Sequence, residues 1–147
     1  MSKSDVAVEV FRGGANCSQA VLGAYAAEHG LTSELALKIA CGFGGGIGRL
    51  GHTCGAVAGA VMAIGLVAGD AEPTGAANKA RVYGLVQSFV EQFEAKHHTI
   101  LCSELIGCDI NTPQGYEEAT ARGVFTTLCP EYVRDAVEIL EELLDRP

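Results

Sequence analysis

The chain has little charge and no run of lysine and arginine. Among its 147 residues, 19% are charged and 48% are hydrophobic, and the formal net charge is −8 at pH 7. Disordered proteins are instead poor in apolar residues and rich in charge, so we expect this chain to fold. An acidic chain also repels phosphate backbones, and we therefore expect no nucleic acid among its partners.

Signals for export and membrane insertion are missing as well. Residues 1–16 contain charges of both signs and no apolar stretch followed by a small-residue cleavage site. The longest uncharged stretch, residues 50–69, contains five glycines and a histidine, which favours a buried core helix over a membrane span. We therefore expect a cytoplasmic protein that does not bind membranes.

Strand patterns, linkers and internal repeats are also absent, and the length suits one domain over residues 1–147. Capping residues, glycine stops and apolar stripes predict a compact all-α bundle of five to six helices. The helices are expected at residues 16–29, 33–41, 53–69, 73–96, 113–122 and 130–144, with a glycine-rich loop at 42–48. The helix at 53–69 is expected at the centre, because its small residues let a neighbouring backbone approach closely.

The C-x-x-C spacing is absent, although the chain has six cysteines. This absence excludes a thioredoxin-like dithiol, ordinary zinc fingers and covalent haem attachment. Structural disulfides are rare in a reducing cytosol, so metal binding or redox chemistry is favoured, with inert buried thiols as the alternative. Any site must be assembled by tertiary structure from distant positions, which are Cys17, Cys41, Cys54, Cys102, Cys108 and Cys129.

Three of the cysteines lie at predicted helix starts. Cys17 and Cys54 directly follow capping residues, and Cys129 precedes a proline. A helix N-terminus presents unpaired N–H groups and a partial positive charge, which lowers the pKa of a thiol. We therefore expect thiolates at these three positions, in the form that attacks disulfides and binds metals.

The cysteine motifs resemble those of a known family. Residues 54–59, Cys-Gly-Ala-Val-Ala-Gly, are similar to the central motif of the C_GCAxxG_C_C family, which is described as redox-active. The surrounding order is similar too, with Asn-Cys-Ser-Gln-Ala-Val at 16–21 and the glycine-rich loop upstream. Residues 102–105 and Cys129 follow downstream, so the resemblance covers nearly the whole chain.

The resemblance implies a set of functional cysteines and a cofactor. The family's four cysteines fall on Cys17, Cys54, Cys102 and Cys129, which leaves Cys41 and Cys108 outside the pattern. A similar cysteine-rich helical segment occurs in split-Soret cytochrome c, where an iron–sulfur centre accompanies the haems. Because this chain lacks haem-attachment motifs, the resemblance implies at most the cluster.

Three functions are consistent with these four cysteines. The first is an iron–sulfur or other metal centre, held by three or four of them for electron transfer. The second is a thiol–disulfide or persulfide relay, in which the same cysteines are catalytic. The third is a structural zinc module without catalysis. An oxidoreductase activity, the identity of a redox partner and a homo-oligomeric state stay open.

The glycine-rich loop has two interpretations. Residues 46–51 match the G-x-G-x-x-G pattern of dinucleotide-binding folds, but a predicted helix precedes them where that fold needs a strand. We instead expect Gly44, Gly45 and Gly46 to carry backbone N–H groups close to the cysteine site. These groups would donate to sulfur or to a bound anion.

The remaining candidates lie outside the family pattern. His52, two residues before Cys54, is expected to be a metal ligand, a proton donor or a solvent-exposed loop histidine. Cys108, six residues after Cys102, is expected to be a spare ligand or a resolving thiol. Cys41 ends a short apolar helix and is expected to be a small buried hydrophobic residue.

Overall fold

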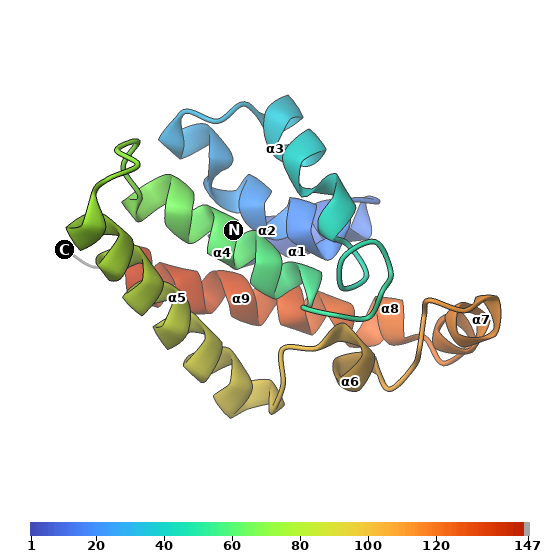
Figure 1. The fold of residues 1–147 in the computed structure, drawn as a ribbon. Helices are drawn as coiled ribbons and strands as arrows, with labels where there is room; N and C mark the ends of the chain where they lie inside the picture. The colour runs from blue at the N-terminus through green and yellow to red at the C-terminus, as the bar shows by residue number, and fades with distance from the viewer. Residues whose placement is uncertain (146–147) are drawn as a thin grey trace.

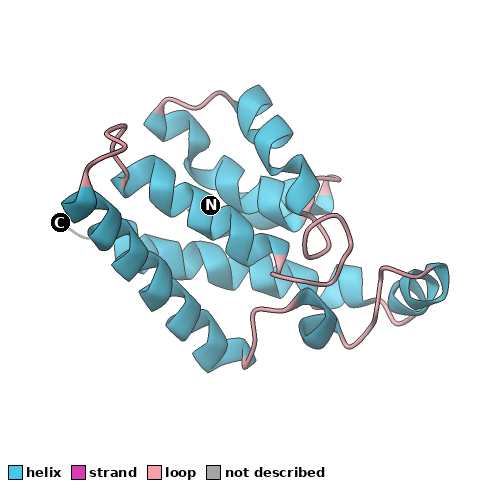
Figure 2. Ribbon diagram, in the orientation of Figure 1, coloured by secondary structure: helices cyan, strands magenta, loops and turns pink. Residues whose placement is uncertain are grey.

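The computed structural model describes residues 1–145, and helices dominate them (Figure 2). The only β-type contact in this part of the chain is one isolated antiparallel bridge between Thr53 and Leu101. The predicted all-α class is therefore confirmed. In chain order (Figure 1) the helices are α1 (Lys3–Arg12), α2 (Cys17–Ala26), α3 (Ser33–Ala40), α4 (Gly55–Ala68), α5 (Ala76–His97), α6 (Cys102–Ile106), α7 (Pro113–Ala121), α8 (Val124–Thr127) and α9 (Cys129–Leu144).

The described chain forms more helices than the five to six predicted. The unpredicted α1 begins with a capping box, in which the Ser2 hydroxyl accepts from the Asp5 N–H and the Asp5 carboxylate accepts from the Ser2 N–H, both at 3.1 Å. The Ser-x-x-acid pattern of this capping box can be recognised in the sequence. The four-residue α8 follows Gly123 without a side-chain cap, so it had no comparable signal.

Helix α4 lies at the centre, as its small residues predict. It packs against α2, α5 and α9, and Figure 1 shows it running between α2 and α9. Its 14 residues are apolar throughout, which is typical of a helix buried on several sides. Within residues 1–145, no helix combines the length and the apolarity needed to cross a membrane.

The close packing of α2 on α4 depends on Gly59. A Cβ atom at this position would lie 2.7 Å from the Ser18 carbonyl oxygen and 3.1 Å from the Ser18 Cα atom. Both atoms belong to the backbone of α2, which cannot move aside as easily as a side chain can. At Gly65, two turns further along the same helix, an added Cβ atom would meet nothing within 4 Å.

We expect Gly59→Ala to lower the free energy of unfolding by about 1–3 kcal/mol, because the added methyl group overpacks the α2–α4 contact. The control Gly65→Ala should raise it by up to about 1 kcal/mol, since alanine is the better helix former and the site has room. Urea unfolding followed by circular dichroism measures both. Equal effects of the two substitutions would contradict the proposed contact.

Candidate functional site

Four helices have a cysteine at, or directly before, their first residue. Cys17, Cys102 and Cys129 are the first residues of α2, α6 and α9, and Cys54 directly precedes α4. All four line a cavity of about 400 Å³. The sequence predicted three of these helix starts but missed the one at Cys102. The structure thus brings together the four cysteines that the family resemblance selects.

The position of Cys17 follows from local hydrogen bonds around the start of α2. The Asn16 side chain accepts from the Gln19 N–H, and the Gln19 side chain accepts from the Asn16 N–H, both at 2.9 Å. The same two side chains donate to the carbonyls of Cys41 and Leu37, again at 2.9 Å. This capping box therefore starts the helix at Cys17 and also ties it to the end of α3.

Backbone hydrogen bonds hold Cys54 and Cys102 side by side. The Cys54 N–H donates to the Ile100 carbonyl at 2.7 Å, and the Cys102 N–H donates to the His52 carbonyl at 2.6 Å. The Tyr132 hydroxyl of α9 donates to the Leu105 carbonyl of α6 at 2.8 Å. These contacts join the starts of α4 and α6 and pack α6 against the helix that begins at Cys129.

The glycine-rich segment passes closely over the site. Its first residues form a short 3-10 turn, Cys41–Phe43, and backbone turns continue to residue 51. Gly46 has a φ angle of +73°, and a Cβ atom there would lie 2.7 Å from the Cys102 Cβ atom. Only glycine satisfies both demands. Gly44 and Gly45 line the cavity, whereas the buried Gly46 packs behind Cys102.

Burial opposes the thiolates predicted at helix starts. Burial raises the pKa of Cys54 to about 11, although the N–H groups of Ala56 and Val57 act in the opposite direction. Neither N–H forms a side-chain cap hydrogen bond with the sulfur. Burial, together with the charges of Cys54 and Cys129, raises the pKa of Cys102 to about 12. The predicted lowering of the Cys54 pKa is therefore wrong, because desolvation outweighs the helix terminus.

Cys17 and Cys129 behave differently because they are partners. Side-chain hydrogen bonding between them raises the pKa of Cys17 well above its usual value, and burial adds to this rise. The same hydrogen bond lowers the pKa of Cys129. Within the pair, Cys129 is therefore the thiol that ionises more readily. The predicted lowering holds for Cys129 and is wrong for Cys17.

The thiols are not arranged around a single ion. Across residues 1–145, no three histidine, cysteine or acidic side chains lie close enough together to hold one metal ion. A mononuclear zinc site needs four ligands at about 2.0–2.3 Å from the metal. The four cysteines line one cavity without forming such a group.

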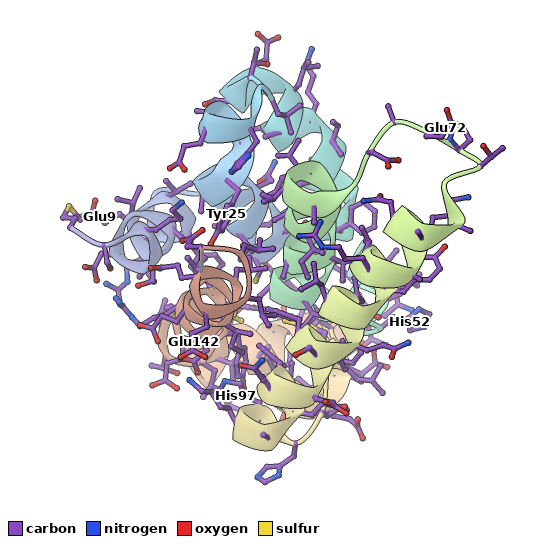
Figure 3. The ribbon with its side chains drawn as sticks, turned by 90° about the vertical axis from the view of Figure 1, so that its left-hand side faces the viewer. Glu9, Tyr25, His52, Glu72, His97 and Glu142 are labelled. Carbon is purple, nitrogen blue, oxygen red and sulfur yellow. The ribbon has the colours of Figure 1, made fainter. Side chains whose placement is uncertain are left out.

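The structure also places the three remaining candidates, and His52 is the solvent-exposed histidine that was one of its predicted alternatives. Cys41 is exposed and lines the cavity, because α3 buries only Ala36 and Ala40 and the next position turns away from that face. The His52 side chain is exposed and lies outside the cavity lining (Figure 3). Cys108 is buried away from the cavity, where the Arg122 guanidinium donates to its sulfur at 3.3 Å. Neither His52 nor Cys108 is placed to act as a ligand.

The sequence did not predict two of the residues that line the cavity. Arg49 of the glycine-rich segment stacks over the ring of Tyr116 in α7, with its guanidinium carbon 4.3 Å from the ring centroid. These residues are 67 positions apart, so no local pattern could pair them. The rest of the lining is largely apolar and includes Phe11, Leu105, Ile106, Ile110, Phe125 and Tyr132.

Comparison with known proteins identifies the family of this chain. Residues 15–143, which include all four cavity cysteines, match a family described as "Putative redox-active protein (C_GCAxxG_C_C)". No curated protein and no solved structure matches the chain. The family match covers most of the sequence and includes the whole set of helix starts that form the site. The chain therefore belongs to the C_GCAxxG_C_C family.

Proposed function

We propose that Cys17, Cys54, Cys102 and Cys129 hold an iron–sulfur cluster that serves electron transfer. The observation that carries this proposal is the convergence of four thiols, each from a different helix start, on one cavity. Four cysteine thiolates are the usual ligands of [2Fe–2S] and [4Fe–4S] clusters. A redox dithiol would use only two of these cysteines, whereas a cluster gives a role to all four.

The surroundings of the thiols suit such a group. A cluster bound by four thiolates is negatively charged, and the helix N-termini provide partial positive charge towards it. No aspartate or glutamate is among the residues that line the cavity.

The chain's own residues would set the properties of the centre. A bound cluster takes up and releases single electrons. Burial of Cys54, Cys102 and Cys129 and the apolar lining would limit the access of water to the sulfurs. Backbone N–H groups near the sulfurs would raise the reduction potential by stabilising the reduced, more negative state. Because Cys54 and Cys102 have raised pKa values, loading must displace their protons and is favoured by higher pH.

A reversible disulfide between Cys17 and Cys129 is the second candidate, because the interaction between these two thiols raises the pKa of Cys17 and lowers that of Cys129. The Cys129 thiolate would attack an external disulfide, form a mixed disulfide and release one thiolate. The Cys17 sulfur would then attack Cys129, release the second thiolate and give up its proton. The external disulfide is reduced to two thiols as the protein pair is oxidised. No comparable observation favours a zinc module or a persulfide relay.

The test is the iron, zinc and acid-labile sulfide content per chain, measured after purification and reconstitution without oxygen. We expect iron and sulfide together, with visible absorption that bleaches on reduction. Zinc without sulfide would contradict the cluster. A protein that stays free of iron but oxidises to a Cys17–Cys129 disulfide, located by peptide mapping, would contradict the cluster and support the second candidate.

A further inference from the structure

The cysteine cavity has an exposed mouth as well as a buried floor. Cys54, Cys102 and Cys129 are buried, whereas Cys41 and Arg49 are exposed lining residues. The volume of about 400 Å³ lies within the range of roughly 300–1,000 Å³ that is typical of small-molecule sites. Such sites combine an apolar lining with a few polar groups that orient the ligand.

Among the described residues that line this cavity, Arg49 is the only arginine, lysine, aspartate or glutamate. Among the described residues it forms no ion pair, although the chain contains 18 acidic residues and has a net charge of −8. Its contacts are with Tyr116, through the stacking described above and a 3.5 Å approach of Nη2 to the phenol oxygen. The guanidinium therefore keeps most of its hydrogen-bond donors free.

The backbone holds Arg49 in an unusual conformation. Its φ angle is +68°, in the left-handed region that non-glycine residues rarely adopt. Its N–H donates to the Gly44 carbonyl at 3.2 Å. At Gly45, an added Cβ atom would lie 2.8 Å from the Arg49 Cγ atom and 2.9 Å from its Cα atom. The glycine-rich segment thus makes room for the arginine and fixes it at the mouth.

We propose that the outer part of this cavity binds a small organic anion, namely a carboxylate with an apolar or aromatic body. The carboxylate would pair with the Arg49 guanidinium, which matches it through two parallel hydrogen bonds. The body would contact the aromatic rings of Phe11, Tyr116 and Phe125, which line the same cavity. The ligand would lie between solvent and the cysteines. This binding does not depend on which redox chemistry the cysteines perform.

Benzoate is the probe, and isothermal titration calorimetry with the intact protein is the measurement. We expect wild-type protein to bind benzoate more tightly than benzyl alcohol, which lacks the charge, and than acetate, which lacks the ring. Arg49→Gln should weaken benzoate binding about 10-fold or more, because a hydrogen-bonded charge pair is lost. The matched control is Arg81→Gln, which removes the same charge from an exposed position on α5 and should leave binding unchanged.

Three outcomes would overturn the proposal. They are a wild-type protein that does not bind benzoate, equal binding by Arg49→Gln, and an equal loss in Arg81→Gln. If Arg49→Gln fails to fold, Arg49→Lys is tested in its place. The lysine variant should bind benzoate more weakly than wild type and still prefer benzoate to benzyl alcohol. Loss of that preference would overturn the proposal. Iron measured in the same samples after reconstitution without oxygen separates this inference from the cluster. Benzoate binding by protein that still contains no iron would contradict the cluster alone.

Discussion

Replacement of Cys54 by serine is expected to abolish iron and labile sulfide binding while leaving the helices folded. Cys54 directly precedes α4 and lines the cavity. A serine oxygen is a poor substitute for the soft thiolate ligands of iron–sulfur clusters. Burying a hydroxyl in place of this thiol should also cost about 1–3 kcal/mol of stability. Cys17→Ser and Cys102→Ser should lose the cluster in the same way. Iron content and circular dichroism of each variant test this result.

Cys108→Ser is the matched control for these substitutions. Cys108 is buried like Cys54, but it lies outside the cavity, so its replacement should affect stability without removing iron. Cys41→Ser should also keep the iron, at little cost in stability because the residue is exposed. Loss of iron in Cys108→Ser together with its retention in Cys54→Ser would show that the cluster is held elsewhere.

Gly46→Ala is expected to damage both the fold and the site. The substitution forces alanine to a φ angle of +73° and places a methyl group 2.7 Å from the Cys102 Cβ atom and 2.6 Å from the His52 backbone nitrogen. Backbone strain and overpacking together should lower the free energy of unfolding by about 2–4 kcal/mol. Displacement of Cys102 should also reduce the iron content. Urea unfolding and iron analysis measure the two effects.

Gly48→Ala separates backbone strain from the contact with Cys102. Gly48 also has a positive φ angle, +54°, but an added Cβ atom there would meet nothing within 4 Å. Its replacement should therefore cost about 1 kcal/mol from strain alone and leave the iron content unchanged. If the two variants lose the same stability and the same amount of iron, the close approach of Gly46 to Cys102 has no functional importance.

The sequence alone determined the helical class and several helix starts. Asn16 and Gln19 form the capping box that starts α2 at Cys17, and Pro130 occupies the second position of α9 beside Cys129. Caps and stops are legible because their hydrogen bonds join residues only three or four positions apart. The capping box of Ser2 and Asp5 was equally legible and predicts the α1 start that the apolar pattern did not reveal.

Only the tertiary structure decided how these local features combine into a site. The start of α6 at Cys102 has no side-chain cap; it is fixed by hydrogen bonds to residues 51 and 52, about 50 positions away in the chain. The pairing of Arg49 with Tyr116 and the exposure of Cys41 likewise depend on how distant elements pack. The thiol pKa values also depend on tertiary structure. A helix N-terminus lowers the pKa of a nearby thiol, but desolvation and neighbouring sulfurs raise it. At Cys17 and Cys54 the raising effects are larger.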